Sequence, residues 1–282
     1  MRLGRSMGAL LVCAALVGCL SSPQSPFGRA IVLADKGQAR AAIDLLEKWL
    51  REHPNANRER RLLVRLYGTS GDLARARTHT ELLARSLGAS SPVAWLELGH
   101  ALELAHRYDE ALALFDKAGA IAPRDPAGPR TGGLRAAAWG ELDWAEPRLV
   151  EAARRDPTDG ATWHALGVVR VKKGDLEGAE QAYRTGLACE PEVMNNRVGL
   201  ATLALVRGDA AQVLREYEAI LRVKPDFVDA HLGRSWALVR LGRFTEAAEA
   251  LALAERLGAD RRSIVRQRRW LAAERAKSAT SR

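Results

Sequence analysis

The chain has 282 residues, 47% of them hydrophobic, and a formal net charge of +9, so it is long enough to bury a substantial core. Its three cysteines are too few for a disulfide-rich scaffold. The positive charge lies at the two ends, because residues 19–260 contain 33 basic and 33 acidic residues. This distribution disfavours a nucleic-acid-binding face.

Residues 1–18 are predicted to be a bacterial secretory signal. Arg2 and Arg5 precede a run of 14 apolar or glycine residues from Met7 to Leu20. The run is shorter than the about 20 residues that cross a hydrocarbon core. A basic head, a short apolar middle and small residues at the end are typical of a cleaved leader.

The end of this segment, "LVGC" from Leu16 to Cys19, resembles the lipobox of bacterial lipoproteins. The resemblance implies cleavage after Gly18, acylation of Cys19 and a short spacer over residues 19–26. Two or three acyl chains hold a protein on a membrane essentially permanently. The absence of Asp at residue 20 favours, by the same resemblance, the outer membrane of the bacterial envelope, facing the periplasm. The alternative is an ordinary cleaved leader in which Cys19 is an incidental apolar residue.

The rest of the chain repeats with a period of 34 residues. Prolines recur at residues 123, 157, 191 and 225, and glycines recur at 37, 71, 140, 174, 208 and 242. The glycines open similar stretches, such as "GDLARA" and "GDLEGA", and "HRYDEA" stands at the missing third slot. A fixed period of this length is the signature of a repeat architecture, in which stacked units supply the core.

The unit "WLELGHALELAHRYDEALALFDKAGAIAP" resembles the tetratricopeptide repeat (TPR). Trp95, Leu98, Gly99, Tyr108 and Phe115 are among its residues at signature positions. The resemblance implies an all-α fold, a right-handed α-solenoid of about seven helix-turn-helix units with a C-terminal capping helix. The units are predicted over 23–56, 57–91, 92–125, 126–159, 160–193, 194–227 and 228–261, so the solenoid covers 23–261 and the basic cap and tail cover 262–282.

Local chemistry supports these units. Gly followed by Asp is expected to end one helix and cap the next. The fourth unit departs from the pattern, because "GPRTGGLRAAAW" places Gly132 where a large apolar residue is usual. Glycine inside a helix costs about 1 kcal/mol relative to alanine, so this unit is predicted to be locally weak. Pro147 is expected in the first turn of its helix, where proline is tolerated.

Catalytic motifs are missing from the sequence. The six histidines are scattered, and neither HExxH, a Walker loop nor Gly-x-Ser-x-Gly occurs. We therefore predict no enzyme activity, no cofactor, no metal, no small-molecule substrate and no nucleic-acid partner. Cys189 has no internal partner if Cys19 is acylated, and we expect it to be a small buried residue rather than a reactive thiol.

The TPR resemblance implies a partner-binding groove lined by the first helices of the units. Three arginines give it a basic N-terminal patch, and an apolar stretch follows, in which Trp236 is the strongest expected anchor. The alternative is that these side chains simply pack between units. The candidates are Arg58, Arg61, Arg65, His100, Arg130, Leu134, Val168, Val171, Asn195, Val198, Leu205, Trp236 and Arg240.

The predicted function is a non-catalytic envelope lipoprotein whose groove binds a segment of another envelope protein and assists assembly of a complex. In architecture it resembles the pilotin-type TPR lipoproteins of type IV pili. The alternatives are a soluble periplasmic chaperone-like or regulatory protein, or an accessory that presents a substrate to an enzyme. The arginines of the cap either solubilise it or contact anionic lipid or glycan.

Overall fold

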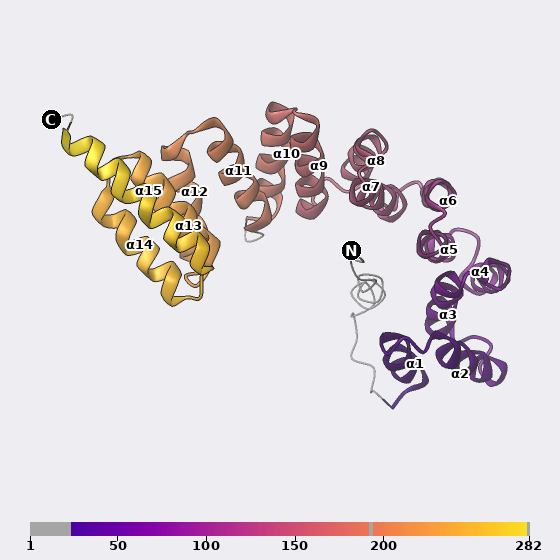
Figure 1. Ribbon diagram of the computed structural model, residues 1–282. Helices are drawn as coiled ribbons and strands as arrows, with labels where there is room; N and C mark the ends of the chain where they lie inside the picture. The colour runs from indigo at the N-terminus through magenta and orange to yellow at the C-terminus, as the bar shows by residue number, and fades with distance from the viewer. Residues whose placement is uncertain (1–23, 192–193, 281–282) are drawn as a thin grey trace. The chain divides into compact units, whose positions relative to one another are not determined.

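Residues 24–191 and 194–280 are described by a computed structural model (Figure 1), and their regular structure is entirely helical. The predicted all-α fold is confirmed. Seven consecutive helix pairs are followed by one last helix. The first helices of the pairs are α1 (Pro26–Asp35), α3 (Asn57–Ser70), α5 (Val93–Leu104), α7 (Ala127–Trp139), α9 (Gly160–Lys173), α11 (Met194–Arg207) and α13 (Val228–Arg240). The second helices are α2 (Ala39–Glu52), α4 (Leu73–Leu87), α6 (Tyr108–Ile121), α8 (Leu142–Arg155), α10 (Leu176–Cys189), α12 (Ala210–Val223) and α14 (Phe244–Arg256), and α15 (Arg261–Thr280) closes the chain.

The helices belong to two compact units. The first unit ends at Trp139 and the second begins at Gly140, so the first contains α1–α7 and the second contains α8–α15. Within each unit, helices that are neighbours in sequence pack against each other, for example α5 on α6 and α13 on α14. The predicted leader and Cys19 lie outside the described residues.

The Gly-Asp pairs form the turns inside the repeats, as predicted. Gly71 follows α3 with a φ of 78°, a left-handed conformation that glycine adopts without a steric cost. Asp72 then caps α4 by accepting a hydrogen bond from the backbone N–H of Arg75 at 3.1 Å. In the third repeat this left-handed position is occupied by His106, with a φ of 60°.

A second recurring contact joins consecutive repeats. In three repeats, the fourth residue of the unit donates a side-chain hydrogen bond to the carbonyl of the proline near the end of the preceding unit. This bond satisfies a backbone acceptor at the junction, where no helical partner is available. The three pairs are Arg60 Nη2 with Pro54, Trp163 Nε1 with Pro157 at 2.8 Å, and His231 Nε2 with Pro225 at 2.7 Å.

In the first unit, α3 and α5 approach each other closely because Gly68 has no side chain. A Cβ built on Gly68 would lie only 2.3 Å from the carbonyl oxygen of Ala101. Tyr67 and Leu66, which neighbour this glycine, are fully buried. The close approach determines which side chains of α3 and α5 meet.

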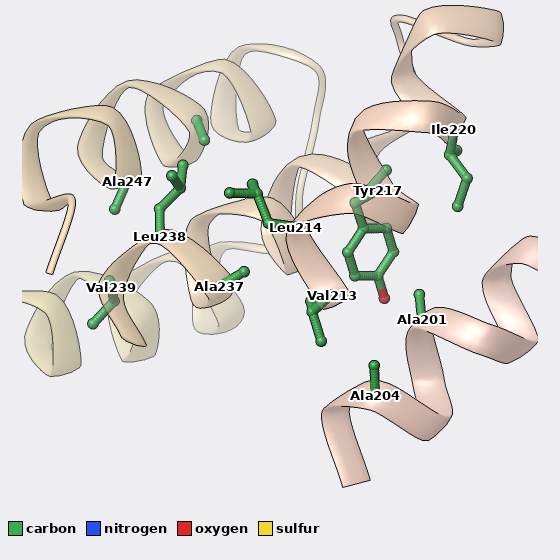
Figure 2. Close-up of a cluster of buried hydrophobic side chains, with 12 residues drawn as sticks. Ala201, Ala204, Val213, Leu214, Tyr217, Ile220, Ala237, Leu238, Val239 and Ala247 are labelled. Atoms are coloured by element: carbon green, nitrogen blue, oxygen red, sulfur yellow. The ribbon is translucent and has the colours of Figure 1, made fainter. Parts of the chain in front are cut away.

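In the second unit, a core of alanines and larger side chains joins four helices (Figure 2). Ala201 and Ala204 of α11 face Val213 and Tyr217 of α12. A Cβ on Gly233 of α13 would lie 2.0 Å from the Tyr217 ring, so a glycine is needed where that ring packs. Small residues at these positions let helices approach while large ones fill the remaining space.

Two local predictions are wrong. Pro147 is the sixth residue of α8 and so lies inside the helix, where proline removes a backbone hydrogen bond. Cys189 is exposed rather than buried, because it is the last residue of α10. Its Sγ lies 3.2 Å from the carbonyl oxygen of Pro157, to which it donates.

Candidate protein-binding surface

The basic patch predicted on α3 is largely neutralised within the first unit. Glu97 of α5 is 1% exposed and accepts hydrogen bonds from both Arg61 and Arg65. The Arg61 Nε to Glu97 Oε1 distance is 2.7 Å. Arg65 is only 6% exposed, so it belongs to the interior and offers no accessible charge to a partner. Arg61 keeps about a third of its side chain exposed.

The other candidates at this end also have internal partners. The guanidinium of Arg58 lies 3.9 Å from the centre of the Phe27 ring, within the range of a cation–π contact. His100 is half-buried, and its Nδ1 lies 3.5 Å from Glu103 Oε2. The Arg58 contact therefore joins α3 to α1, whereas the His100 contact lies within α5.

Glu103, near the end of α5, is contacted by side chains of both α5 and α7. Burial opposes its ionisation, but hydrogen bonds from His100 and Trp139 and the charge of Arg135 outweigh burial, and the pKa of Glu103 is lowered. Arg135 Nε donates to Glu103 Oε1 at 2.8 Å. Glu103 therefore joins α5 to α7. Of the α7 candidates, Arg130 is half-buried and Leu134 is 39% exposed.

In the second unit, the candidate apolar residues lie on three consecutive first helices, α9, α11 and α13. Val168 and Val171 are half-buried against the core that contains Tyr183. Val198 and Leu205 of α11 pack in the same partial way on the next cluster. Each side chain therefore covers the core with part of its surface and leaves the remainder accessible.

Polar candidates border these apolar side chains. Asn195 and Arg240 are exposed. Thr202, which lies between Val198 and Leu205 on the same helix, is also exposed and donates its hydroxyl to the Val198 carbonyl. The resulting surface has an apolar centre and a polar edge, which is the usual composition of protein-binding surfaces. We call it the α9–α13 face.

Trp236 is positioned by the last helix. Its indole ring stacks on that of Trp270 of α15, with centroids 6.3 Å apart and an interplanar angle of 23°. The guanidinium of Arg240 lies 6.0 Å from the Trp236 ring centre. Trp236 is thus half-buried, with one ring face covered by the cap, and Trp270 extends the aromatic surface by one helix.

Three residues were not assigned to these sites from the sequence. Trp270 lies one period of 34 after Trp236, so extending the repeat into the cap would have found it. Glu97 and Gly68 had no such signal, because their roles depend on how closely α3 and α5 approach.

The described residues offer no group of three or more His, Cys, Asp or Glu side chains that could hold a metal ion. None of the described helices combines the length and apolar character that crossing a membrane requires. The apolar centre and polar edge of the α9–α13 face suit the binding of another chain through apolar contacts and edge hydrogen bonds.

Comparison with known proteins identifies the repeat. Residues 61–126 and 198–261 match the family model described as tetratricopeptide repeat. A TPR repeat-containing thioredoxin of Arabidopsis thaliana, TTL4, is 28% identical over 121 residues, which are 40% of this chain and 18% of the plant protein. The chain thus spans less than a fifth of that relative.

Solved structures share the fold at low sequence identity. The C-terminal part of a TPR protein from Cytophaga hutchinsonii has a TM-score of 0.62 and 15% identity, covering 84% of this chain and 98% of that one. Pseudomonas aeruginosa PilF has a TM-score of 0.56 and 16% identity, covering 75% and 96%. YrrB, described as a TPR protein with an unusual peptide-binding site, has a TM-score of 0.55 and 17% identity, covering 66% and 96%. With its 34-residue period, its helix pairs and these matches, the chain contains tetratricopeptide repeats over residues 61–126 and 198–261, and its described residues share the all-α fold of solved TPR structures.

Proposed function

We propose that this protein is a non-catalytic scaffold of the bacterial envelope that binds a segment of another protein on the α9–α13 face. TPR proteins are generally interaction modules, and the residues on this face offer apolar contacts but no catalytic arrangement. The observation that carries the proposal is the row of half-buried apolar side chains on α9, α11 and α13 that ends at the Trp236–Trp270 stack.

The energetics of such a face are sufficient for binding. Burying one large apolar side chain is worth roughly 1.5–3 kcal/mol, and aromatic residues are enriched among those that dominate interface energies. Two or three anchors therefore offset the cost of association and give about micromolar affinity. The exposed Arg240 and Asn195 supply hydrogen-bond donors at the edge.

The location in the envelope is proposed from the sequence. The leader and the lipobox-like "LVGC" support an acyl anchor at Cys19, and the fold shared with PilF is compatible with assistance to a pilus, secretin or motility complex. A soluble periplasmic chaperone-like protein, or an accessory that presents a substrate, would use the same face without the anchor.

A site-specific crosslink tests the binding face. A photoreactive residue at Thr202, which is exposed on this face, is expected to form a discrete adduct with one partner in intact envelopes. The matched control carries the same residue at Ala188, which is exposed at the end of the neighbouring helix α10. Mass spectrometry of the adduct should identify a single segment of the partner. Adducts that are identical at both positions would contradict the proposal.

Trp236→Ala in the Thr202 background is expected to reduce the adduct at least fivefold, because it removes the strongest anchor. Far-ultraviolet circular dichroism should show that helical content is retained. An undiminished adduct would remove Trp236 from the site. The anchor is tested separately by labelling cells with a radioactive fatty acid, where Cys19→Ser should abolish the label. An unlabelled wild-type protein would favour the soluble alternative.

A further inference from the structure

The second helices of the first two repeats, α2 and α4, border a solvent-open hollow of about 630 Å³ in the first unit. Three arginines, Arg51, Arg60 and Arg85, contribute to its lining, together with the apolar side chains of Leu50 and Leu82. None of the candidate partner-binding residues on the first helices lines this hollow. A volume of this size is typical of sites for small organic molecules.

Arg60 is the unusual member of this lining. It is only 5% exposed, and its Nη2 donates to the Pro54 carbonyl while Nη1 lies 3.4 Å from Nδ1 of His79. Its Nε is buried and has no hydrogen-bond partner. In the described part of the chain, no carboxylate forms an ion pair with Arg60. Burial lowers the pKa of the Arg60 guanidinium, which shows that the surroundings disfavour its charge.

The one acidic residue in the lining, Glu47, already has partners. It accepts a hydrogen bond from the Tyr67 hydroxyl and another from Arg75 Nη1 at 3.1 Å. The bond from Tyr67, with the help of Arg75, lowers the pKa of Glu47 although burial opposes this shift. Glu47 pairs with Arg75, which also pairs with Asp72 at 2.6 Å, and it forms no ion pair with Arg60.

The remaining polar lining is favourable to an anion. Burial and the charge of Arg60 lower the pKa of His79 and favour its neutral ring. Arg51 is exposed and forms no ion pair among the described residues, and Arg85 pairs only with exposed Glu81 at 3.9 Å. The lining therefore carries three arginines and one compensated carboxylate.

Among the described residues, Arg60 lacks the carboxylate partner that Arg65 has. Both arginines are buried on α3, but Arg65 is paired with Glu97. A buried charge without a counter-charge is strongly unfavourable, and guanidinium groups match carboxylate and phosphate oxygens in a bidentate geometry. We propose that the hollow binds a small organic anion, with its phosphate or carboxylate group at Arg60, Arg51 and Arg85 and its apolar body on Leu50 and Leu82.

Isothermal titration calorimetry measures the binding of phenyl phosphate, benzoate, inorganic phosphate and neutral phenol to the whole chain. Phenyl phosphate or benzoate should bind at one site, and phenol should not bind. The stronger of the two anions identifies the preferred head group. Inorganic phosphate measures the contribution of the charge alone and should bind more weakly than the ring-bearing anion. The absence of saturable binding for both ring-bearing anions would overturn the proposal.

Variants locate the site. Arg60→Gln removes the charge and should weaken binding at least tenfold. The double variant Arg51→Ala/Arg85→Ala changes only exposed residues, so it folds normally and should weaken binding at least fivefold. Arg40→Ala, an exposed arginine of α2 outside the lining, is the matched control and should bind like the wild type. Unchanged affinity in the double variant would place the anion elsewhere and overturn the proposal.

Discussion

Arg65 and Glu97 form an ion pair inside the first unit, where their side chains are only 7% and 2% exposed. Arg61 adds a second donor to the same carboxylate at 2.7 Å. The pair is possible because Gly68 lets α3 and α5 approach closely. A positive charge that the sequence indicates for binding is therefore used to join the second repeat to the third.

Glu97→Gln is expected to lower the free energy of unfolding by about 3–5 kcal/mol, because it leaves a buried guanidinium without its counter-charge. The measurement is urea unfolding followed by circular dichroism. Glu81→Gln is the matched control, since its pair with Arg85 is exposed, and it should change stability by less than about 1 kcal/mol. A loss for Glu97→Gln as small as that of the control would show that the pair is not needed for packing.

Trp270→Ala is expected to lower stability by about 1–3 kcal/mol, because a half-buried ring that covers Trp236 is removed. It should also weaken partner binding, since Trp236 loses the contact that orients it. Thermal unfolding and the Thr202 crosslink measure the two effects. Trp270→Phe keeps an aromatic face and should recover most of both. Partner binding that is unchanged in Trp270→Ala would separate the cap from the α9–α13 face.

The lowered pKa of Glu103 predicts that the stability of the fold depends on pH. Its folded pKa lies below the ordinary value, so its contribution is fully present above the unfolded pKa and is lost as the pH falls through the folded pKa. Between pH 7 and pH 3, the wild type should therefore lose more stability than Glu103→Gln does. Urea midpoints of both proteins across this range test the sign. Parallel pH profiles would show that the contacts with His100 and Arg135 do not shift the titration of Glu103.

The period of the sequence was enough to predict the helix pairs and the turns between them, because proline and glycine have local conformational preferences that recur every 34 residues. Local rules also explain the Asp72 cap. They failed for Pro147, since helix starts are defined only within a few residues. They failed for Cys189 because a helix end can remain exposed.

The candidate site was less predictable from sequence than the fold. Repeat positions indicate which helices carry Val168 and Trp236, but not how much of each side chain the neighbouring helix covers. Arg65 shows the reason, since its burial depends on Glu97, 32 residues away in another repeat. Such pairing follows from the distance between helices and is not visible in the composition of either helix.

His106 provides a stabilising substitution. It occupies a left-handed backbone position, with a φ of 60°, that glycine fills in most other repeats. A left-handed conformation costs a non-glycine residue about 1–2 kcal/mol, although the 3.0 Å contact between His106 Nδ1 and the Tyr108 hydroxyl offsets part of this. His106→Gly should therefore raise the free energy of unfolding by about 0.5–1 kcal/mol, measured by urea unfolding. His106→Val, which is poorly tolerated at positive φ, should lower it, and the opposite order would contradict the assignment of strain.

The fourth repeat is expected to open before its neighbours. Its helix α7 contains Gly132 and Gly133, and Pro147 interrupts the hydrogen bonds of α8. Each of these residues weakens a helix interior, and local opening follows local stability. Hydrogen exchange monitored by mass spectrometry should therefore show faster exchange for α7 and α8 than for α9 and α10. Equal protection of the fourth and fifth repeats in the wild type would refute the weak repeat.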